Sequence, residues 1–528
     1  MKGGVRLCFL IFLLLEALCS EGCRKEEREA LLGLRSHFDY ANWNVETDCC
    51  EWEGVECNSS TGRVAQLYLY GVWKSTEQYI NYSHFSVFKD LKELHLEDSN
   101  IVGCVEAEEL SNLELLDMSY NNLDTAAGIL SCLDGLPSLK SLYLRYNSFN
   151  TSSLTHVFES VSPKLRSNLE VIDLSRNYLS NDILASMEGF TSLKELYLSG
   201  NLLDSDLHFQ ALCSSFKNLE VLDLSYNNLN HTDIGSALTG LSSLNSLYLT
   251  NSQLSWRSIY NISKLSSLEK LHLGGNNLNE SGTGSILEND TFKWPTNLQR
   301  LSLWSNSLSN KFLSSLRGLP RLQFLDLSYN QLEGSLDISE NETFKWPTNL
   351  QYLSLRNNRL SNRFVSSLRG LPHLQFLDLS YNQLKGALDI SALLTLSSLT
   401  NLDLSHNGIQ NLVAHEDSKS LSKLDVLDLD ENMIDGTKLR ESLRALSSSI
   451  REISMSYNYF NGTIIAGDFH DLSNLEDLRL DGNTITDNEF FKNIGNLTSL
   501  KILSVSDCYI NDILPPTGFF YIKRICRS

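Results

Sequence analysis

The chain has 528 residues, 42% of them hydrophobic, and its formal net charge is −21 with a pI near 5.0. The hydrophobic content excludes a disordered chain, and 29 glycines and 8 prolines are too few for a fibrous one. The acidity argues against nucleic acid as a partner and against electrostatic docking on anionic lipid. It is compatible with a cationic peptide partner, although acidity alone bears mainly on solubility.

Residues 1–22 have the pattern of a secretory signal peptide. Lys2 and Arg6 form a charged start, an apolar run covers 7–15, and small residues around 17–22 form a processing zone. The run is too short to span a bilayer, and no later apolar run of membrane length follows. An uncleaved anchor is the disfavoured alternative, so the chain as written is predicted to be secreted.

Acceptor sites for N-glycosylation support an extracellular location. The pattern Asn-x-Ser/Thr recurs along the chain, although some matches arise by chance in a sequence rich in Asn and Ser. The predicted acceptors are Asn58, Asn81, Asn150, Asn230, Asn261, Asn279, Asn289, Asn341, Asn461 and Asn496.

Residues 23–62 are predicted to form a cap over the open apolar end of the array that follows. An amphipathic helix is expected over 25–38, and four cysteines surround it. Neighbouring cysteines rarely pair with each other, so we expect Cys23 with Cys49 and Cys50 with Cys57, although four cysteines allow three connectivities. The spacing does not match paired Cys-x-x-Cys metal ligands and no histidines complete a set, so no metal and no cofactor are predicted.

Residues 63–512 repeat the phrase Leu-x-x-Leu-x-Leu-x-x-Asn-x-Leu, of which 322–332 is an example. Leu325 and Leu327 alternate with polar residues, which predicts a short strand with leucines inward and polar side chains outward. The amide of Asn330 has both donors and acceptors, so it can satisfy backbone groups of adjacent turns. One coil cannot bury its own apolar face, so the phrase is stable only in a stack.

The phrase returns at intervals of about 22 to 30 residues, which predicts about 18 repeats in one solenoid. Ser99, Ser252 and Cys508 replace the asparagine and can make fewer hydrogen bonds. Residues 292–339 and 344–391 are near-copies, as if two coils had been duplicated in tandem. The asparagine itself occurs at Asn121, Asn147, Asn177, Asn201, Asn227, Asn276, Asn306, Asn330, Asn358, Asn382, Asn407, Asn432, Asn458 and Asn483.

Residues 513–528 break the pattern and are predicted to be an irregular tail. The preferred interpretation is that the chain stops inside a longer ancestral array, which leaves an unprotected sheet edge and a free Cys526. The alternative is that the aromatic residues in 519–522 lie over the last coil as an improvised cap.

The cap sequence Cys49-Cys50-x-Trp52-x-Gly54-Val55-x-Cys57 together with Leu-Asp-Leu-Ser-x-Asn repeats resembles the ectodomains of plant leucine-rich-repeat receptor-like proteins. The resemblance covers about residues 23–512. It implies an α/β leucine-rich-repeat solenoid, curved or superhelical, with a continuous parallel sheet on its concave face. It also implies a cell-surface receptor without a kinase domain, which senses an extracellular ligand in defence or development through a leucine-rich-repeat receptor kinase as co-receptor.

The chain departs from this family in three respects. The usual Gly-x-Ile-Pro continuation survives only as remnants at Gly334, Gly386 and Gly462, so the sequence does not predict the second, convex-side strand. No non-repeat island interrupts the late repeats. The chain as written has no membrane helix, so it is expected to be secreted, and to reside in the plasma membrane with a single pass only if the full-length gene continues as in the family.

Candidate ligand-binding residues are outward strand positions that depart from the Leu-Asp-Leu-Ser-Tyr-Asn consensus. Consensus residues such as Asp223 and Asp326 are interpreted as structural. Exposed aromatics and arginines are favoured interface anchors, with ordinary surface variation as the alternative for each one. The predicted ligand-binding residues are Tyr143, Arg145, Tyr197, Tyr248, His272, Trp304, Arg356 and Arg479.

No catalytic motif is present, and carboxylates that recur with the repeat indicate a solvated face rather than acid–base pairs. Cys104, Cys132 and Cys213 are expected to be buried thiols or an occasional bridge. The leading hypothesis is therefore an extracellular module that recognises a peptide or protein ligand. The alternatives are a secreted inhibitor of a cell-wall-degrading enzyme, since polygalacturonase-inhibiting proteins share the cap and repeat, and a non-functional truncated receptor product.

Overall fold

The computed structural model describes residues 23–510 and 524–526, with internal gaps. The predicted signal peptide and the aromatic residues of 519–522 lie outside the described residues. The described chain divides into two compact units, which we call unit 1 (Met1–Ser252) and unit 2 (Gln253–Ser528). The gaps are 36–42, 70–77, 106–109, 124, 134, 205–215, 231–233, 235–237, 280–291, 335–344, 415–420, 447–448, 459–468, 470 and 486–489.

The cap at the start of unit 1 consists of a helix, a 3₁₀ turn and an edge strand. Helix α2 (Lys25–Leu34) has acidic residues in its first turn, which suits the positive end of the helix dipole, and it buries Leu31 and Leu34. The 3₁₀ turn η1 (Cys49–Glu51) leads to β1 (Val55–Cys57), which pairs antiparallel with β2 (Val64–Tyr68). Disulfides join Cys23 to Cys49 and Cys50 to Cys57, the expected pairing.

In unit 1, each repeat contributes one short strand to a parallel sheet, and successive strands pair in register. The middle residue of each three-residue strand is a buried Leu or Ile, while its two neighbours face outward. The strands after β2 are β4 (Glu93–His95), β6 (Leu115–Asp117), β7 (Ser141–Tyr143), β8 (Val171–Asp173), β9 (Glu195–Tyr197), β10 (Val221–Asp223) and β11 (Ser246–Tyr248).

Unit 2 repeats the same arrangement, again with parallel pairing in register. The leucine-rich-repeat fold predicted from the sequence is thereby confirmed. The strands are β12 (Lys270–His272), β13 (Arg300–Ser302), β14 (Phe324–Asp326), β16 (Tyr352–Ser354), β18 (Phe376–Asp378), β20 (Asn401–Asp403), β22 (Val426–Asp428), β23 (Glu452–Ser454), β24 (Asp477–Arg479) and β26 (Ile502–Ser504).

One further strand lies within the segment predicted as an irregular tail, and the rest of that segment lies outside the described residues. Strand β28 (Arg524–Cys526) lies parallel to β26 and in register with it. The unpaired N–H and C=O groups of an edge strand accept any segment that can extend alongside them, which accounts for this pairing outside the repeat pattern.

The asparagine ladder forms as predicted. The Asn330 side-chain nitrogen donates to the carbonyl of Leu303 in the preceding coil and to Leu327 in its own coil, both at 3.0 Å. Its side-chain oxygen accepts from the N–H of Leu308 at 3.1 Å, so the one amide serves two coils. Where serine replaces asparagine, as at Ser252, the hydroxyl reaches the carbonyl of Leu224 at 3.2 Å but cannot reproduce the full set.

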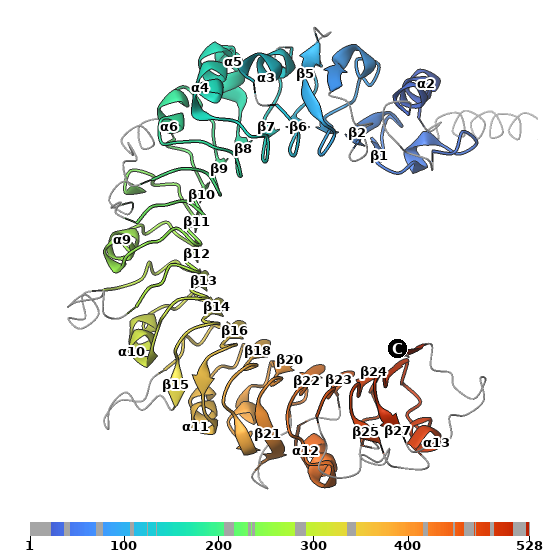
Figure 1. The fold of residues 1–528 in the computed structure, drawn as a ribbon, viewed down its shortest axis with the longest axis vertical. Coiled ribbons are helices and arrows are strands. Elements are labelled where there is room, and N and C mark those ends of the chain that lie inside the picture. The colour runs from blue at the N-terminus through green and yellow to red at the C-terminus, as the bar shows by residue number, and fades with distance from the viewer. Residues whose placement is uncertain are drawn as a thin grey trace, which may run out of the picture. The chain divides into compact units, whose positions relative to one another are not determined.

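Helices cover the side of each unit that faces away from the long sheet (Figure 1). None of the described helices has the length and apolarity needed to cross a bilayer. The helices are α3 (Ala126–Leu133), α4 (Thr151–Ser160), α5 (Pro163–Asn168) and α6 (Ile183–Ser186) in unit 1, and α9 (Trp256–Ile262), α10 (Asn310–Leu313), α11 (Asn362–Val365), α12 (Leu439–Leu446) and α13 (Phe490–Ile494) in unit 2. Further 3₁₀ turns are η2 (Tyr82–His84), η4 (Ser314–Leu316), η5 (Ser366–Leu368), η6 (Leu393–Thr395) and η7 (Gly436–Lys438).

Second strands, which the sequence did not predict, form on this outer side in several coils. The remnant glycines Gly334 and Gly386 lie within two of them and adopt positive φ of 59° and 62°. Each pair is parallel. The pairs are β3 (Gln78–Asn81) with β5 (Ile101–Val105), β15 (Glu333–Gly334) with β17 (Arg359–Leu360), β19 (Lys385–Asp389) with β21 (Gly408–Val413), and β25 (Thr484–Ile485) with β27 (Tyr509–Ile510).

A third disulfide joins β5 to helix α3 in unit 1 through Cys104 and Cys132. Gly103 and Gly128 make the close approach possible, because a Cβ at Gly103 would lie 3.1 Å from the Cα of Gly128. Of the two interpretations given to these cysteines, the structure supports the bridge. Cys213 lies outside the described residues.

Candidate functional site

The exposed face of the long sheet carries three rows of side chains in each unit. The first row holds the first residue of each strand, the second row the third residue, and the third row the residue two positions later. Because the strands are parallel and in register, equivalent positions lie side by side about 4.8 Å apart. The structure places Tyr143, Tyr197, Tyr248, His272 and Arg479 in the second row, and Arg145, Trp304 and Arg356 in the third.

In unit 1, tyrosines and aspartates alternate along the second row from β6 to β11. Tyr143 lies between Asp117 and Asp173, and Tyr197 lies between Asp173 and Asp223. Burial raises the pKa of the Asp173 and Asp223 carboxyls, and also raises the pKa of the Tyr143 and Tyr197 phenols. Tyrosine hydroxyls and aspartate carboxyls therefore alternate along this row, and the Tyr197 hydroxyl already donates to Glu195 at 2.7 Å.

Arg145 extends this row with a cationic and aromatic cluster. Its guanidinium donates to the Tyr120 hydroxyl at 2.7 Å and lies 5.0 Å from the centre of that ring. Tyr120 and Tyr146 stack with their centroids 4.4 Å apart, and each is 42% exposed.

Tyrosines of the repeat consensus were interpreted from the sequence as structural residues. The structure shows that several of them are also exposed and lie in left-handed turns. Tyr120, Tyr146, Tyr226, Tyr329, Tyr381 and Tyr457 precede a ladder asparagine, have positive φ of 53–56° and are exposed. The left-handed turn directs the side chain away from the coil, which the periodicity alone did not reveal.

In unit 2 the predicted residues do not form one cluster. The His272 pKa is lowered to about 4 by burial and by the charges of Arg300 and Lys270, so its imidazole is neutral near pH 7. Trp304 covers Gly274, where a Cβ would overlap the indole ring. Arg479 donates to Asp477 at 2.9 Å and lies 3.3 Å from Glu452, so its charge is already compensated.

Arg356 is held by its neighbours in the third row. Its guanidinium donates to the Ser380 hydroxyl at 3.0 Å and lies 4.2 Å from the centre of the Tyr381 ring. Tyr381 in turn stacks on His406, with centroids 3.8 Å apart. The result is a fixed, partly exposed cation on an aromatic support.

Sequence reasoning missed three stacked aromatic residues in the first row of unit 2, which we call the aromatic row: Phe324, Tyr352 and Phe376. They lie on adjacent strands β14, β16 and β18, with centroids 4.3 Å and 4.5 Å apart and nearly parallel rings. Arg300 covers one end of the row at 4.2 Å from the Phe324 centroid. The duplicated segments were the available signal, because they place phenylalanine at the same strand position twice.

Beside the aromatic row lie four carboxylates of the second row, which we call the acidic row: Asp326, Asp378, Asp403 and Asp428. Burial is the main cause that raises the pKa of Asp326, Asp378 and Asp428, and neighbouring carboxylates raise it further. The pKa of Asp428 is raised to about 7, with Asp430 and Asp403 as the like charges.

The Asp428→Asn substitution is expected to stabilise the protein near pH 7.5 and to have little effect near pH 4. The native carboxyl titrates near pH 7 and the unfolded one near 3.8, so the native state binds more protons between these values. The wild-type free energy of unfolding therefore falls as pH rises through that window. Asparagine does not titrate, so the variant should be more stable than the wild type by about 2 kcal/mol at pH 7.5, a value that allows for partial exposure of the carboxyl.

Urea unfolding at pH 4, 5.5 and 7.5 measures this effect. Glu441→Gln on α12 is the matched control, because that carboxylate is exposed on a helix of the outer side. Equal pH profiles for wild type and Asp428→Asn would contradict the assignment.

One group in unit 1 has the composition of a metal site. Ligand atoms of His95, Glu97 and Asp117 lie within 4.8 Å of one another, the one such group among the described residues. A hydrogen bond with Asp117 raises the pKa of Glu97 to about 7, and the Arg145 charge lowers it. The positive charge of Arg145 opposes a cation, and a shared proton satisfies the two carboxyls, so we assign no metal here.

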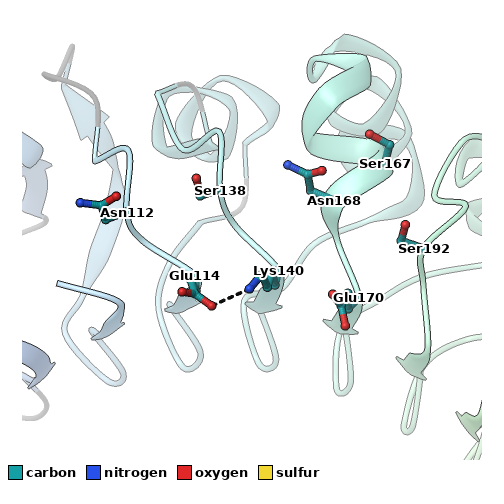
Figure 2. Close-up of a pocket in the computed structure, with 8 residues that line it drawn as sticks. All are labelled: Asn112, Glu114, Ser138, Lys140, Ser167, Asn168, Glu170 and Ser192. Atoms are coloured by element: carbon teal, nitrogen blue, oxygen red, sulfur yellow. Dashed lines mark hydrogen bonds and ion pairs between the residues drawn. The ribbon is translucent and has the colours of Figure 1, made fainter. Parts of the chain in front are cut away.

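A polar hollow of about 370 Å³ lies beside four coils of unit 1, and Figure 2 shows its lining. Its charged residues belong to a ladder just before the strands: Glu114 lies 2.9 Å from Lys92 and 2.7 Å from Lys140, and Lys194 lies 2.6 Å from Glu170. The Asn168 amide in the same hollow donates to the carbonyl of Pro137 at 2.8 Å. These groups satisfy one another between coils, which indicates a structural role.

The predicted glycosylation sites differ in exposure. Asn150, Asn279 and Asn496 are exposed, and Asn58, Asn81 and Asn230 are partly exposed. Asn261 is only 8% exposed, and its side-chain oxygen accepts from Lys264. Asn289, Asn341 and Asn461 lie outside the described residues, and use of every site stays a prediction.

Family models agree with this geometry. The leucine rich repeat N-terminal domain matches residues 24–58. Leucine rich repeat models match residues 218–241, 321–341 and 336–384. The matched segments are the disulfide-bonded cap and coils from both units.

Among known proteins, the chain is 32% identical over 246 residues to putative receptor-like protein 8 of Arabidopsis thaliana, covering 42% of this chain and 23% of that protein. It is 29% identical over 411 residues to receptor-like protein EIX1 of Solanum lycopersicum, covering 70% of this chain and 35% of that protein. The matches therefore span well under two thirds of either relative. The solved plant peptide hormone receptor RGFR1 in complex with RGF2 is 19% identical, covers 88% of this chain and 84% of that chain, and has a TM-score of 0.41. The chain has the leucine-rich-repeat fold, its matched segments are similar to leucine-rich-repeat models, and the curated relatives that it matches are plant receptor-like proteins.

Proposed function

We propose that the chain is an extracellular recognition module that binds a peptide or protein ligand on the exposed face of its long sheet. In a full-length receptor of the type that its relatives represent, the bound module would signal through a leucine-rich-repeat receptor kinase as co-receptor, in defence or development. The disulfide-bonded cap fits an oxidising, extracellular environment.

The observation that carries this proposal is the composition of the exposed face. Tyrosine, phenylalanine and arginine side chains are held there in fixed stacks, as in the cluster of Arg145, Tyr120 and Tyr146 and in the aromatic row. Rigid aromatic residues and arginine supply large contact area at low entropic cost, and they dominate the energy of protein interfaces. Broad rows of such residues suit contact with another chain better than enclosure of a small molecule.

Panning a displayed random dodecapeptide library against the secreted chain tests the proposal. Enriched peptides are synthesised and titrated by calorimetry against Tyr143→Ala and Arg356→Ala, one variant on the exposed face of each unit. Lys164→Ala on α5 and Lys311→Ala on α10 are exposed controls on the helix side. We expect at least one face variant to weaken binding about tenfold, as hot-spot residues do, with the controls unchanged. No enrichment, or equal affinities for face and control variants, would overturn the proposal.

A further inference from the structure

The aromatic row and the acidic row lie directly beside each other in unit 2. Strands β14 and β18 each contribute one residue to both rows. The pairs, two positions apart on the strand, are Phe324 with Asp326 and Phe376 with Asp378. The acidic row continues onto β20 and β22 with Asp403 and Asp428. Residues two apart on a strand share a face and lie about 6.6 Å apart, so an apolar strip runs alongside an anionic one.

The chain itself places a cation at one end of this aromatic row. The guanidinium of Arg300 lies over Phe324, whose other face is covered by Tyr352. At the opposite end, Phe376 stacks on Tyr352 with one face only. Its other side adjoins Asn401 at the same position of β20, and among the described residues no cation lies over the Phe376 ring.

The carboxylates nearest to Phe376 on the β20 side form no direct ion pair within the described chain, although the charge of Arg479 acts on Asp428 and lowers its pKa. Asp403 uses Oδ1 to accept from the N–H and hydroxyl of Ser405, and Asp428 uses Oδ1 to accept from the N–H of Asp430. No hydrogen bond to the Oδ2 atom of either one is found in the described part of the chain. The cations closest to the rows are engaged elsewhere, Arg356 over Tyr381 and Arg479 with Asp477 and Glu452.

We propose that this surface binds an arginine-containing cationic peptide, with one guanidinium packed against Phe376 and Asn401 and paired with Asp403, and a second cation at Asp428. The inference rests on the proposed function and specifies the ligand class for unit 2. An arginine side chain combines a planar cation that stacks on aromatic rings with an apolar stem that covers ring edges. An arginine side chain is long enough to cover the offset of about 6.6 Å between the aromatic row and the acidic row.

A peptide suits the geometry better than other cationic ligands. The carboxylates lie on β14, β18, β20 and β22, with Ser354 at the equivalent position of β16. Each commits one oxygen to its own turn, so they do not converge on a single metal ion. A chain with basic side chains at alternate positions presents them about 6.6 Å apart, and their long stems can bend to reach carboxylates about 4.8 Å apart on neighbouring strands. The net charge of −21 favours the approach of such a peptide.

The test uses fluorescein-labelled Gly-Arg-Gly-Arg-Gly amide and its citrulline counterpart, which has the same shape without the charge. Binding to the full chain is followed by fluorescence anisotropy at 50 mM and 300 mM salt. We expect the arginine peptide to bind, more weakly at high salt, and the citrulline peptide to bind about tenfold more weakly or not at all.

Variants locate the site. Asp403→Asn with Asp428→Asn should weaken binding of the arginine peptide about tenfold, and Phe376→Leu, which keeps an apolar side chain but removes the ring, about threefold. Glu333→Gln with Glu441→Gln removes the same charge from exposed positions on the outer side and should change the affinity less than about twofold. Thermal unfolding confirms that each variant is folded.

Equal losses in the two double variants would show nonspecific attraction to an acidic protein and overturn the inference. Failure of the arginine peptide to bind, or equal binding of the citrulline peptide, would overturn it as well. These outcomes are distinct from failure of the proposed function, because panned peptides that bind the exposed face without basic residues would leave recognition intact and remove only the cationic assignment.

Discussion

Replacing Asn330 with alanine is expected to lower the free energy of unfolding by about 3 to 5 kcal/mol, because buried groups lose partners that water cannot replace. The substitution leaves the carbonyls of Leu303 and Leu327 and the N–H of Leu308 without the amide that bonds them. Two adjacent coils are affected at once, since the amide joins them.

Urea denaturation followed by circular dichroism measures the change. Asn330→Ser should lose less than Asn330→Ala, because serine keeps one bond to the preceding coil, as Ser252 does to Leu224. Gln331→Ala is the matched control: it removes a carboxamide from the neighbouring exposed position and should change stability by about 0.5 kcal/mol or less. Similar losses for Asn330→Ala and Gln331→Ala would contradict the role assigned to the ladder.

Removing the disulfide between Cys104 and Cys132 is expected to have the next largest effect. Its cysteines are separated by 28 residues, and the chain-entropy relation for a loop of that length gives a loss of about 3.6 kcal/mol. Cys104→Ala with Cys132→Ala avoids leaving a free thiol or a buried hydroxyl at these buried positions.

The cap disulfide between Cys50 and Cys57 is the internal comparison. It closes a separation of only 7 residues, for which the same relation gives about 2.4 kcal/mol. The double alanine variants of the two bridges should therefore differ in urea midpoint, with the Cys104–Cys132 variant the less stable. A larger loss from the cap bridge, or no loss from either, would contradict a contribution governed by loop length.

The repeat pattern was sufficient to predict the strands, the buried leucines and the asparagine ladder. Each of these depends on neighbours within one coil or the next, so local periodicity carries the information. Asn330 illustrates this, because every partner of its amide lies at the same offset in its own coil or the preceding one.

Contacts between residues at different positions of their repeats could not be predicted from the repeat pattern. Cys104 and Cys132 occupy different offsets in their repeats, so only the stacked coils bring them together. The pairing of β19 with β21 forms without the family's Gly-x-Ile-Pro sequence, because an adjacent extended segment supplies the hydrogen bonds. The aromatic row could not be predicted without knowing which coils of the duplicated segments lie next to each other.

The same limit applies to the candidate site. The sequence identified outward residues one at a time, and the structure shows that Arg479 is paired with carboxylates while Arg145 is supported on tyrosines. Whether a side chain is available depends on its neighbours one strand away, and those neighbours lie more than twenty residues along the chain.

The tandem near-copies of residues 292–339 and 344–391 have a consequence for molecular recognition. They place Phe324 and Asp326 on β14, and then Phe376 and Asp378 two strands further along, at about 10 Å by the usual strand spacing. A short partner seated on one copy would meet almost the same chemistry after a shift of two strands. Coil duplication thus lengthens a contact surface in fixed increments and gives a sliding partner more than one register in which to dock.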